Sequence, residues 1–402
     1  MTKDLAQELA QRVQRIKPSP TLSIAARAEE LQAEGKPILN LSIGEPDFDT
    51  PDHIKEAAIK AIHEGHTKYT AVDGIKTLKQ AVVQKFEREN NLHYDLNQIL
   101  ISCGAKHSIY NLLSAILNPG DEVIIPAPYW VSYPDMVKLT DGNPVIVKTD
   151  FSQQFKMTPA QLNAAITNKT RALILNSPSN PTGLAYTREE LAALGQVLLQ
   201  HPSIIVVSDD IYEHNLWHHT PFTNILNACP ELYGRCIVIN GVSKSYAMTG
   251  WRIGYAAGPV KIIAAMKKAQ SQSTSNPTSI SQYAARAALE GDQACVSIMT
   301  NAYKERHDFV IAALQGMPGI KCIPSDGTFY TFPSVEGVFN PEKMITNDLE
   351  FAEYLLTKAD IAIVPGTAFG APGHIRICFT TSKQNLVIAM ERMKQAISEL
   401  IS

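Results

Sequence analysis

Residues 236–254 read CIVINGVSKSYAMTGWRIG, and this stretch decides the fold because it joins an apolar run to a polar turn. The run from Cys236 to Asn240 has the length and character of a strand that is buried on both faces of a sheet. Lys244 follows it, so a parallel sheet would deliver its amine to the edge where ligands bind. Arg252, eight residues further on, offers a planar fork of donors that suits a phosphate group.

Seven short apolar runs between residues 95 and 260 indicate the strands of one sheet. They are residues 98–102, 122–126, 145–147, 172–176, 204–208, 236–240 and 253–257. Polar residues stand mainly at their ends and helical patterns separate several of them, which fits parallel strands joined by crossover helices. Thr187 and Glu190 form the capping-box pattern that begins one such helix. The sequence therefore predicts an α/β fold with a mostly parallel central sheet.

The chain of 402 residues is long enough for two domains. A helical stretch from about Ser279 to Gln315 would link the sheet to a C-terminal unit, in which residues 328–333 and 374–380 have the pattern of strands. The amino-terminal segment is too short to fold alone, so we expect it to pack on that unit. The prediction is a large three-layer α/β/α domain at residues 47–285 and a smaller α+β domain built from residues 1–46 and 286–402.

Composition and charge exclude several classes of function. A hydrophobic content of 45% with 19% charged residues is typical of a soluble globular protein, and a net charge of −3 gives no basic field for nucleic acid or an anionic membrane. The six cysteines contain no CxxC pair, which favours reduced thiols over disulfides or a zinc site. Residues 1–15 have the pattern of a short amphipathic helix and lack the features of a signal or transit peptide, so we expect a cytoplasmic protein.

Four polar or aromatic side chains come just after predicted strands, where a ligand would bind. Asp209 could hold a ring nitrogen in its protonated form, and the Tyr212 phenol could hydrogen-bond to a ring oxygen. Asn180 stands in a proline-rich loop, from which its amide could reach a ligand oxygen, and the face of Trp130 could stack on a planar ring. A helix cap for Asp209, a rigid turn around Asn180 and a core position for Trp130 are the structural alternatives.

Two further features favour anionic ligands. Gly104, Ala105 and Lys106 join a predicted strand to a helix, whose free N–H groups form a phosphate site together with Arg252. Arg376 is a charge within an apolar strand, and it either forms a buried salt bridge or grips a substrate carboxylate through its fork. An amine, a carboxylate, a phenol and guanidinium groups in this arrangement are what pyridoxal 5′-phosphate requires.

The histidines give no metal site in the sequence. His63 and His66 lack the spacing of a helical zinc pair, and His214, His218 and His219 stand in a polar loop without cysteine partners. We therefore expect no metal ligands.

Taken together, these motifs resemble the class I (fold type I) pyridoxal-phosphate-dependent aminotransferases, particularly the bacterial aspartate aminotransferase branch. The resemblance extends from Lys17 to Arg376 and covers nearly the whole chain. It rests on the motifs at residues 44–48, 180–183, 209–212 and 243–254, together with Tyr69 and the pair Asp73-Gly74. The chain departs from the family at Asp210, where glutamate is usual, and it has Ser243 at a position where the family allows several small residues.

The resemblance implies a role for each candidate residue. Lys244 would form the Schiff base and move the proton at the substrate Cα, Asp209 would contact the ring nitrogen, and Tyr212 would contact the ring hydroxyl. Asn180 would also contact the ring hydroxyl, and Trp130 would stack on the ring face. The phosphate would be bound by Gly104, Ala105, Lys106, Arg252 and a neighbouring subunit's Tyr69. The α-carboxylate would be bound by Gly44, Arg376, Asn180 and Trp130. A homodimer with shared active sites follows from the role of Tyr69.

The resemblance also implies the reaction, a two-step transfer of the amino group from L-aspartate to 2-oxoglutarate that yields oxaloacetate and L-glutamate. Lys106 would pair with the distal carboxylate of an acidic substrate, with assistance from Lys17. Aromatic, prephenate, alanine or broader amino-acid specificity is the alternative, as is a β-lyase. A non-catalytic sensor fused to a DNA-binding module would need a winged-helix domain of about 70 residues at the amino end, for which residues 1–40 are too short.

Overall fold

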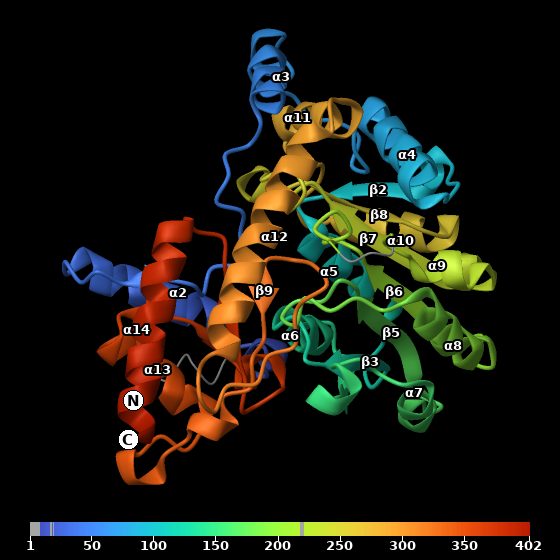
Figure 1. The fold of residues 1–402 in the computed structure, drawn as a ribbon. Coiled ribbons are helices and arrows are strands. Elements are labelled where there is room, and N and C mark those ends of the chain that lie inside the picture. The colour runs from blue at the N-terminus through green and yellow to red at the C-terminus, as the bar shows by residue number, and fades with distance from the viewer. Residues whose placement is uncertain (1–8, 17, 19, 218–220) are drawn as a thin grey trace, which may run out of the picture.

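A seven-stranded sheet lies at the centre of the fold of the computed structural model, which describes residues 9–16, 18, 20–217 and 221–402 (Figure 1). Its strands are β2 (Ile99–Ser102), β3 (Glu122–Ala127), β4 (Asn143–Lys148), β5 (Thr170–Asn176), β6 (Ile205–Asp209), β7 (Cys236–Gly241) and β8 (Gly254–Ala257). Their order across the sheet is β2-β8-β7-β6-β5-β3-β4. Each predicted run forms one of these strands, and the predicted fold class, with its mostly parallel sheet, is confirmed.

The strand β8 is antiparallel to its neighbours, so the prediction that this run forms a parallel strand was wrong. Gly254, the first residue of β8, pairs in antiparallel register with Ser102 at the end of β2 and with Gly241 at the end of β7. The segment between β7 and β8 contains only a short 3₁₀ turn instead of the crossover helix that a parallel return usually requires. Because β8 starts at the edge where β2 and β7 end, Arg252 reaches the same edge as Lys244.

Helices cover both faces of the sheet. One face carries α4 (Lys76–Asn90), α7 (Pro159–Ala165), α8 (Arg188–Leu199), α9 (Ile225–Ala228) and α11 (Ser279–Glu290), and the other carries α5 (Ala105–Ile116), α6 (Ser132–Leu139) and α10 (Val260–Ser271). Successive residues of β7 alternate between the two hydrophobic cores, with Cys236 and Val238 in the first and Ile237 and Ile239 in the second. This double burial explains why the strands are almost continuously apolar.

The Thr187 hydroxyl accepts a hydrogen bond from the Glu190 N–H and the Glu190 side chain accepts one from the Thr187 N–H, so the predicted capping box begins α8. The helix α3 (Asp52–His63) packs against α11 and stands away from the sheet (Figure 1).

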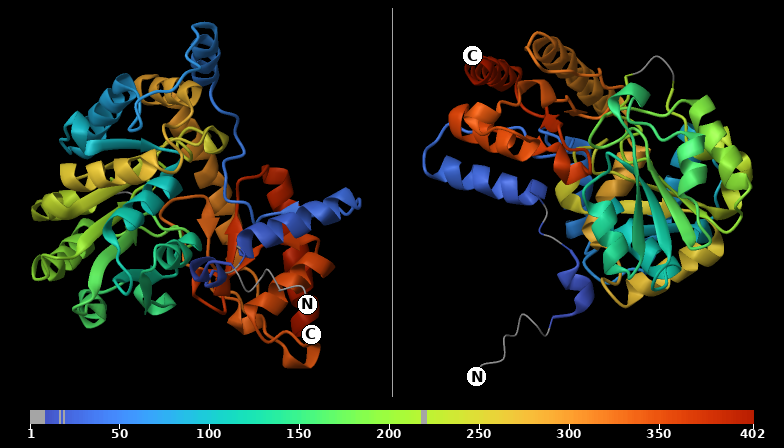
Figure 2. Two further views of the ribbon diagram at one scale, coloured as in Figure 1. Left: turned by 180° about the vertical axis from the view of Figure 1, so that it is seen from behind. Right: turned by 90° about the horizontal axis from the view of Figure 1, so that it is seen from below.

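A third hydrophobic core lies beside the sheet and is built mainly from the C-terminal third of the chain. Its elements are α12 (Ala294–Gln315), α13 (Asp348–Lys358), α14 (Lys383–Ile401) and a small sheet of β11 (Val364–Pro365), β12 (Ile375–Cys378) and β9 (Tyr330–Thr331). The amino-terminal segment packs here, because β1 (Leu39–Asn40) pairs in parallel with β10 (Ile361–Ala362) and α2 (Pro20–Ala33) contacts β10 and β11 (Figure 2).

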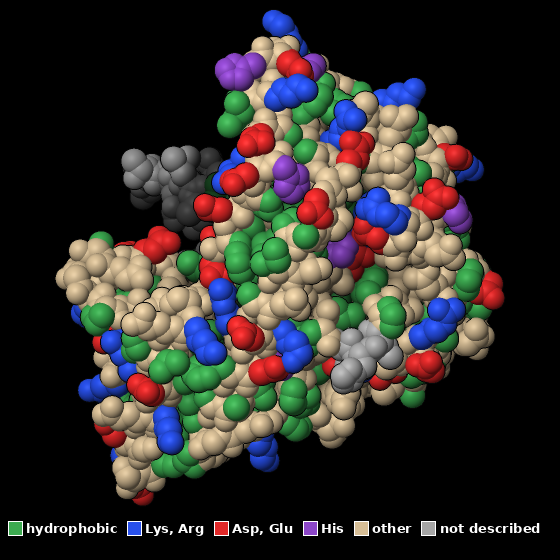
Figure 3. Space-filling view, turned by 45° about the horizontal axis from the view of Figure 1, so that its top comes forward, with side chains coloured by type: hydrophobic (Ala, Val, Ile, Leu, Met, Phe, Trp, Pro, Cys, Tyr) green, Lys and Arg blue, Asp and Glu red, His purple; other side chains and the backbone are tan. Residues whose placement is uncertain are grey.

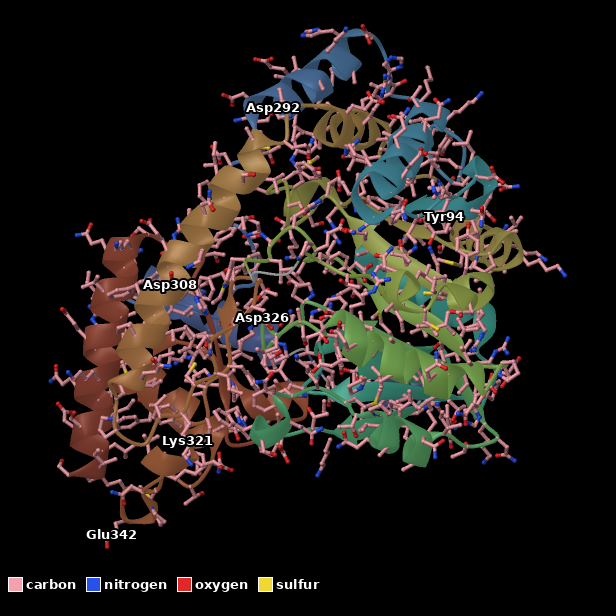
Figure 4. The ribbon with its side chains drawn as sticks, turned by 45° about the vertical axis from the view of Figure 1, so that its right-hand side comes forward. Tyr94, Asp292, Asp308, Lys321, Asp326 and Glu342 are labelled. Atoms are coloured by element: carbon pink, nitrogen blue, oxygen red, sulfur yellow. The ribbon has the colours of Figure 1, made fainter. Side chains whose placement is uncertain are left out.

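The helical stretch predicted from Ser279 to Gln315 is two helices, because Gly291 interrupts it between α11 and α12. Gly291 adopts an extended backbone, and the carboxylate of Asp292 (Figure 4) accepts a hydrogen bond from the Ala294 N–H to start α12. Of the helix predicted in residues 1–15, the described part is α1 (Gln11–Gln14).

Asp326 (Figure 4) ties the two parts of the chain together. Its carboxylate accepts a hydrogen bond from the Ala185 N–H at 2.9 Å, and its carbonyl accepts one from the Trp217 N–H at 3.0 Å. We propose that the sheet with the cores on its two faces forms one domain, at residues 47–285, and that the C-terminal core belongs to a second, at residues 1–46 with 286–402.

Acidic and basic side chains are interspersed over the face shown in Figure 3, in keeping with the small net charge. Among the helices of the described residues, none is both long and apolar enough to cross a membrane.

Candidate active site

A cavity of about 300 Å³ lies at the edge of the sheet where the parallel strands end. Of the predicted site residues, those that line it are Gly44, Ala105, Lys106, Trp130, Asn180, Asp209, Tyr212, Lys244, Arg252 and Arg376. They come from the strand ends of the sheet and from the segments that hold Gly44 and Arg376, so the cavity lies between the sheet and the C-terminal part of the chain. Strand ends that are far apart in sequence therefore meet at one site, as the pattern of polar residues after apolar runs predicts.

Gly104 does not line the cavity but makes room for Arg252. A Cβ on Gly104 would lie 2.6 Å from the Arg252 Nη2 atom, and the φ of +91° at Gly104 is one that other residues rarely adopt. Arg252 also has a positive φ, of 56°, and its Nη1 donates to the Thr249 carbonyl at 2.8 Å. The guanidinium is thereby held beside the start of α5, where the Ala105 and Lys106 N–H groups have no partner within the helix.

Lys244 lies where its amine can act as a base. Its Nζ donates a hydrogen bond to the Gly44 carbonyl at 2.7 Å and lies 5.6 Å from the centre of the Phe329 ring. Burial lowers the pKa of the Lys244 amine to about 8, and the charges of Arg376 and Arg252 act in the same direction. With a pKa of about 8, roughly a tenth of the amine is uncharged at pH 7.

Asp209 is a buried carboxylate at the end of β6. The Tyr133 hydroxyl donates to its Oδ2 at 2.5 Å, and the Ile211 N–H donates to its Oδ1 at 3.3 Å. Burial raises the pKa of Asp209 to about 6, against the opposing effect of these hydrogen bonds. Tyr133 was missed by the sequence analysis because it lies on α6 and faces the site only through helix geometry.

Arg376 lines the cavity, is 3% exposed, and has only uncharged hydrogen-bond partners. Its Nη1 donates to the Asn180 Oδ1 at 3.0 Å and its Nη2 donates to the Ser42 carbonyl at 2.6 Å, while its buried Nε has no hydrogen-bond partner in the described chain. Within that part of the chain no carboxylate pairs with it, which disfavours the structural salt bridge. A buried cation with an unused donor at a cavity wall favours an anionic ligand.

Tyr330 is a cavity residue that the sequence analysis did not single out. It lies on β9, and its hydroxyl is 3.0 Å from the hydroxyl of Tyr212. It also leaves no room for a side chain at Gly44, because a Cβ there would lie 2.3 Å from the Tyr330 hydroxyl. Its sequence context, a short apolar strand, carries no signal that distinguishes it from core.

Tyr69 lies outside the cavity of its own chain and is 92% exposed. Lys17, which was expected to assist acidic substrates, lies outside the described residues.

Comparison with known proteins identifies the family. The family model described as "Aminotransferase class I and II" matches residues 36–393. The chain belongs to this family. It is 54% identical over 396 residues to the "Aspartate/prephenate aminotransferase" of Nitrosomonas europaea, which covers 97% of this chain and 100% of that protein.

Two solved structures are similar to this aminotransferase over nearly their whole length. The aspartate aminotransferase of Rhizobium meliloti has a TM-score of 0.94 and 47% identity, covering 97% of this chain and 98% of that one. The aspartate aminotransferase of Thermus thermophilus with maleate has a TM-score of 0.91 and 41% identity, covering 96% and 99%. The family resemblance inferred from the motifs is therefore confirmed.

One cluster of possible metal ligands in the described part of the aminotransferase was not anticipated. Glu89, Glu213 and His214 lie close enough to share an ion. However, the fully buried amine of Lys85 pairs with Glu213 and lies 3.4 Å from Glu89, and the His214 Nε2 is 2.9 Å from Glu89. Each carboxylate is thus already held by a neighbouring side chain of the protein.

Asp210, the departure from the family pattern, is a second buried carboxyl beside Asp209. The Ser208 hydroxyl donates to its Oδ1 at 2.7 Å, and the Asn224 amide donates to its Oδ2. Burial, aided by the charge of Glu213, raises the pKa of Asp210 from 3.8 to about 8. Asp210 is therefore mainly neutral at pH 7.

Replacing Asp210 with asparagine should stabilise the protein increasingly as the pH rises from 5 to 8. Between the unfolded pKa of 3.8 and the folded pKa of about 8, the folded state binds a proton that the unfolded state lacks. The free energy of unfolding of the wild type then falls by up to about 1.4 kcal/mol per pH unit from this group. Asp210→Asn removes that slope, which thermal unfolding midpoints at pH 5, 6.5 and 8 would measure.

The matched control is Asp95→Asn, at an exposed helix start that asparagine also caps. A stability difference between Asp210→Asn and the wild type that does not change with pH would contradict the raised pKa of Asp210.

Proposed function

We propose that this aminotransferase transfers the amino group of L-aspartate to 2-oxoglutarate, with pyridoxal 5′-phosphate as its cofactor, and that the products are oxaloacetate and L-glutamate. The observation that carries the proposal is the Lys244 amine, which burial keeps partly uncharged within a cation-rich cavity. The charged side chains of that lining are Lys106, Lys244, Arg252 and Arg376 against the single carboxylate of Asp209. Such a lining suits a ligand set with several negative charges.

The cavity fits the cofactor by its donor set. The phosphate would be held by Gly104, Ala105, Lys106 and Arg252. The Arg252 guanidinium fills the space that a side chain at Gly104 would occupy, so it lies beside the start of α5. Asp209 would pair with the ring nitrogen, whose positive charge would keep this buried carboxylate ionised. When bound, the cofactor supplies an aldehyde that captures amino groups and a ring that accepts electrons.

The remaining contacts with the cofactor come from side chains that line the cavity. Tyr212 and Asn180 would hydrogen-bond to the ring hydroxyl, and Trp130 would stack on the ring. The Asn180 Oδ1 accepts from Arg376, so its amide nitrogen is left to donate into the cavity.

The protein side chains then divide the work of the reaction. Lys244 would take the proton from the substrate Cα and give it to the cofactor C4′. Its pKa of about 8 suits both the uptake and the release of a proton near neutral pH. Arg376 would hold the α-carboxylate through its fork, with Asn180 and Gly44 beside it. This grip orients the Cα–H bond toward the Lys244 amine.

A homodimer completes the proposed site. Tyr69 is almost fully exposed in the single chain, yet the motif that contains it matches the family's phosphate contact. We propose that the tyrosine reaches the phosphate of a neighbouring subunit, which would bury it.

Lys106 is the proposed determinant of acidic substrates. Its Nζ lies 4.9 Å from the centre of the Trp130 ring, and burial, with the charge of Arg252, lowers the pKa of its amine. Prephenate is a second candidate substrate, because the Nitrosomonas europaea relative is named for aspartate and prephenate. Prephenate also carries a second carboxylate that Lys106 could pair with.

Replacing Lys106 with alanine should lower kcat/KM for aspartate about 10–100-fold and that for alanine much less, because only aspartate has a distal carboxylate to lose a charge-assisted hydrogen bond. Steady-state kinetics with both donors would measure the ratio. The control variant is Lys268→Ala, a lysine on the exposed side of α10. Equal losses for the two donors would assign Lys106 to the phosphate alone.

A panel of donors and acceptors tests the proposed reaction directly. We expect purified protein saturated with pyridoxal 5′-phosphate to use aspartate far better than alanine with 2-oxoglutarate as acceptor, and glutamate far better than alanine with oxaloacetate as acceptor. Prephenate in place of oxaloacetate tests the second candidate. Turnover of aromatic or neutral donors without turnover of aspartate would overturn the proposal.

A further inference from the structure

Tyr330 connects the two halves of the proposed site. It is 1% exposed, and its hydroxyl lies 3.0 Å from the Tyr212 hydroxyl. The Arg376 guanidinium carbon lies 4.4 Å from the centre of the Tyr330 ring. One side chain therefore touches both the phenol proposed for the cofactor and the cation proposed for the substrate carboxylate.

Counting protons gives the direction of the hydrogen bond between the two phenols. Each hydroxyl has one proton to donate and can also accept. If Tyr212 donates its proton to a ligand in the cavity, its contact with Tyr330 must be one in which Tyr330 donates. A donor behind Tyr212 polarises its O–H bond and strengthens its hydrogen bond to the ligand.

We propose that Tyr330 is a positioning residue, whose hydroxyl strengthens the hydrogen bond from Tyr212 to the cofactor and whose ring holds the Arg376 guanidinium in place to bind the substrate carboxylate. This inference rests on the proposed function. The two contributions are separable, because the hydroxyl and the ring of Tyr330 serve different partners.

The surroundings of Tyr212 support a neutral phenol as the donor. Burial raises the pKa of Tyr212 well above its usual range, so its proton stays in place. The charged groups that face it are Asp209, Arg376 and the Lys244 amine, which lies 6.0 Å from its ring.

Tyr330→Phe isolates the hydroxyl. In the holoenzyme, the hydrogen bond from Tyr212 stabilises the deprotonated form of the lysine-bound cofactor, so weakening it should raise the pH midpoint of the visible absorbance change by about 0.3 unit. The dissociation constant of succinate, a dicarboxylate probe for Arg376, should change less than about twofold, since the ring remains.

Tyr330→Leu removes the ring as well. It should shift the absorbance midpoint in the same direction and weaken succinate binding about 5–30-fold, as expected for the loss of a desolvated cation–π contact. If this variant fails to fold, Tyr330→Phe alone still tests the hydroxyl.

The matched control is Tyr303→Phe. Tyr303 is a fully buried tyrosine of the same aromatic cluster, 5.4 Å from the Phe329 ring, and its hydroxyl has no hydrogen-bond partner in the described chain. Its absorbance midpoint should equal that of the wild type. An unshifted midpoint in Tyr330→Phe would overturn the inference while leaving the proposed function intact, whereas a wild type without any visible band would overturn both.

Discussion

Replacing Lys244 with alanine is expected to abolish turnover and to remove the visible absorbance of the bound cofactor. The loss has two sources. Lys244 is the proposed attachment point of the cofactor, and it is also the proposed base that moves the proton at the substrate Cα. Removing a positioned acid–base group typically costs about 10²–10⁴-fold, so a kcat/KM at least about 10⁴-fold lower is expected from both losses together. Coupled assays of oxaloacetate formation would measure it.

The cavity offers a second lysine, which makes the assignment sharper. Borohydride reduction of the wild-type holoenzyme should fix the cofactor to the peptide that contains Lys244, and not to the peptide that contains Lys106. Lys268→Ala, which alters an exposed lysine, should retain both turnover and the visible band. Cofactor trapped on Lys106, or turnover retained in Lys244→Ala, would contradict the proposed mechanism.

The strands and most of the cavity residues could be predicted from sequence because both depend on local pattern. A parallel strand buried on both faces must be apolar along its length, and the first polar residues after it stand at the ligand-binding edge. Asp209 after β6 and Lys244 after β7 follow this rule, and the structure places both in one cavity. Their chemistry is also explicit in their residue types, an acid and an amine.

The rest depends on contacts that no local pattern encodes. The apolar run of β8 fits a parallel or an antiparallel strand equally well. Its direction follows from the short connection after β7, which has no crossover helix. Tyr133 and Tyr330 are phenols within ordinary helix and strand patterns, and their roles follow from a 2.5 Å contact with Asp209 and a 3.0 Å contact with Tyr212. Such contacts join residues distant in the chain and exist only in the folded protein.

Replacing Arg376 with alanine is expected to lower kcat/KM for both the amino donor and the oxo-acid acceptor about 30–5000-fold, which corresponds to about 2–5 kcal/mol for truncating one partner of a buried charge pair. The loss should fall on both half-reactions, because aspartate and 2-oxoglutarate each carry the carboxylate that Arg376 is proposed to hold. Arg376→Lys should recover only part of the loss, since a lysine keeps the charge but lacks the planar fork that reaches Asn180, the Ser42 carbonyl and the ligand together.

A donor without an α-carboxylate separates this role from a structural one. β-Alanine keeps the distal carboxylate of aspartate but lacks the α-carboxylate, so its low rate should be nearly the same in Arg376→Ala as in the wild type. Arg286→Ala, which removes a partly exposed arginine of α11 that pairs with Glu290, should leave both donors unaffected. If Arg376→Ala slowed aspartate and β-alanine by the same factor, the arginine would serve the shape of the cavity wall instead of the substrate, and its unpartnered Nε would need another explanation.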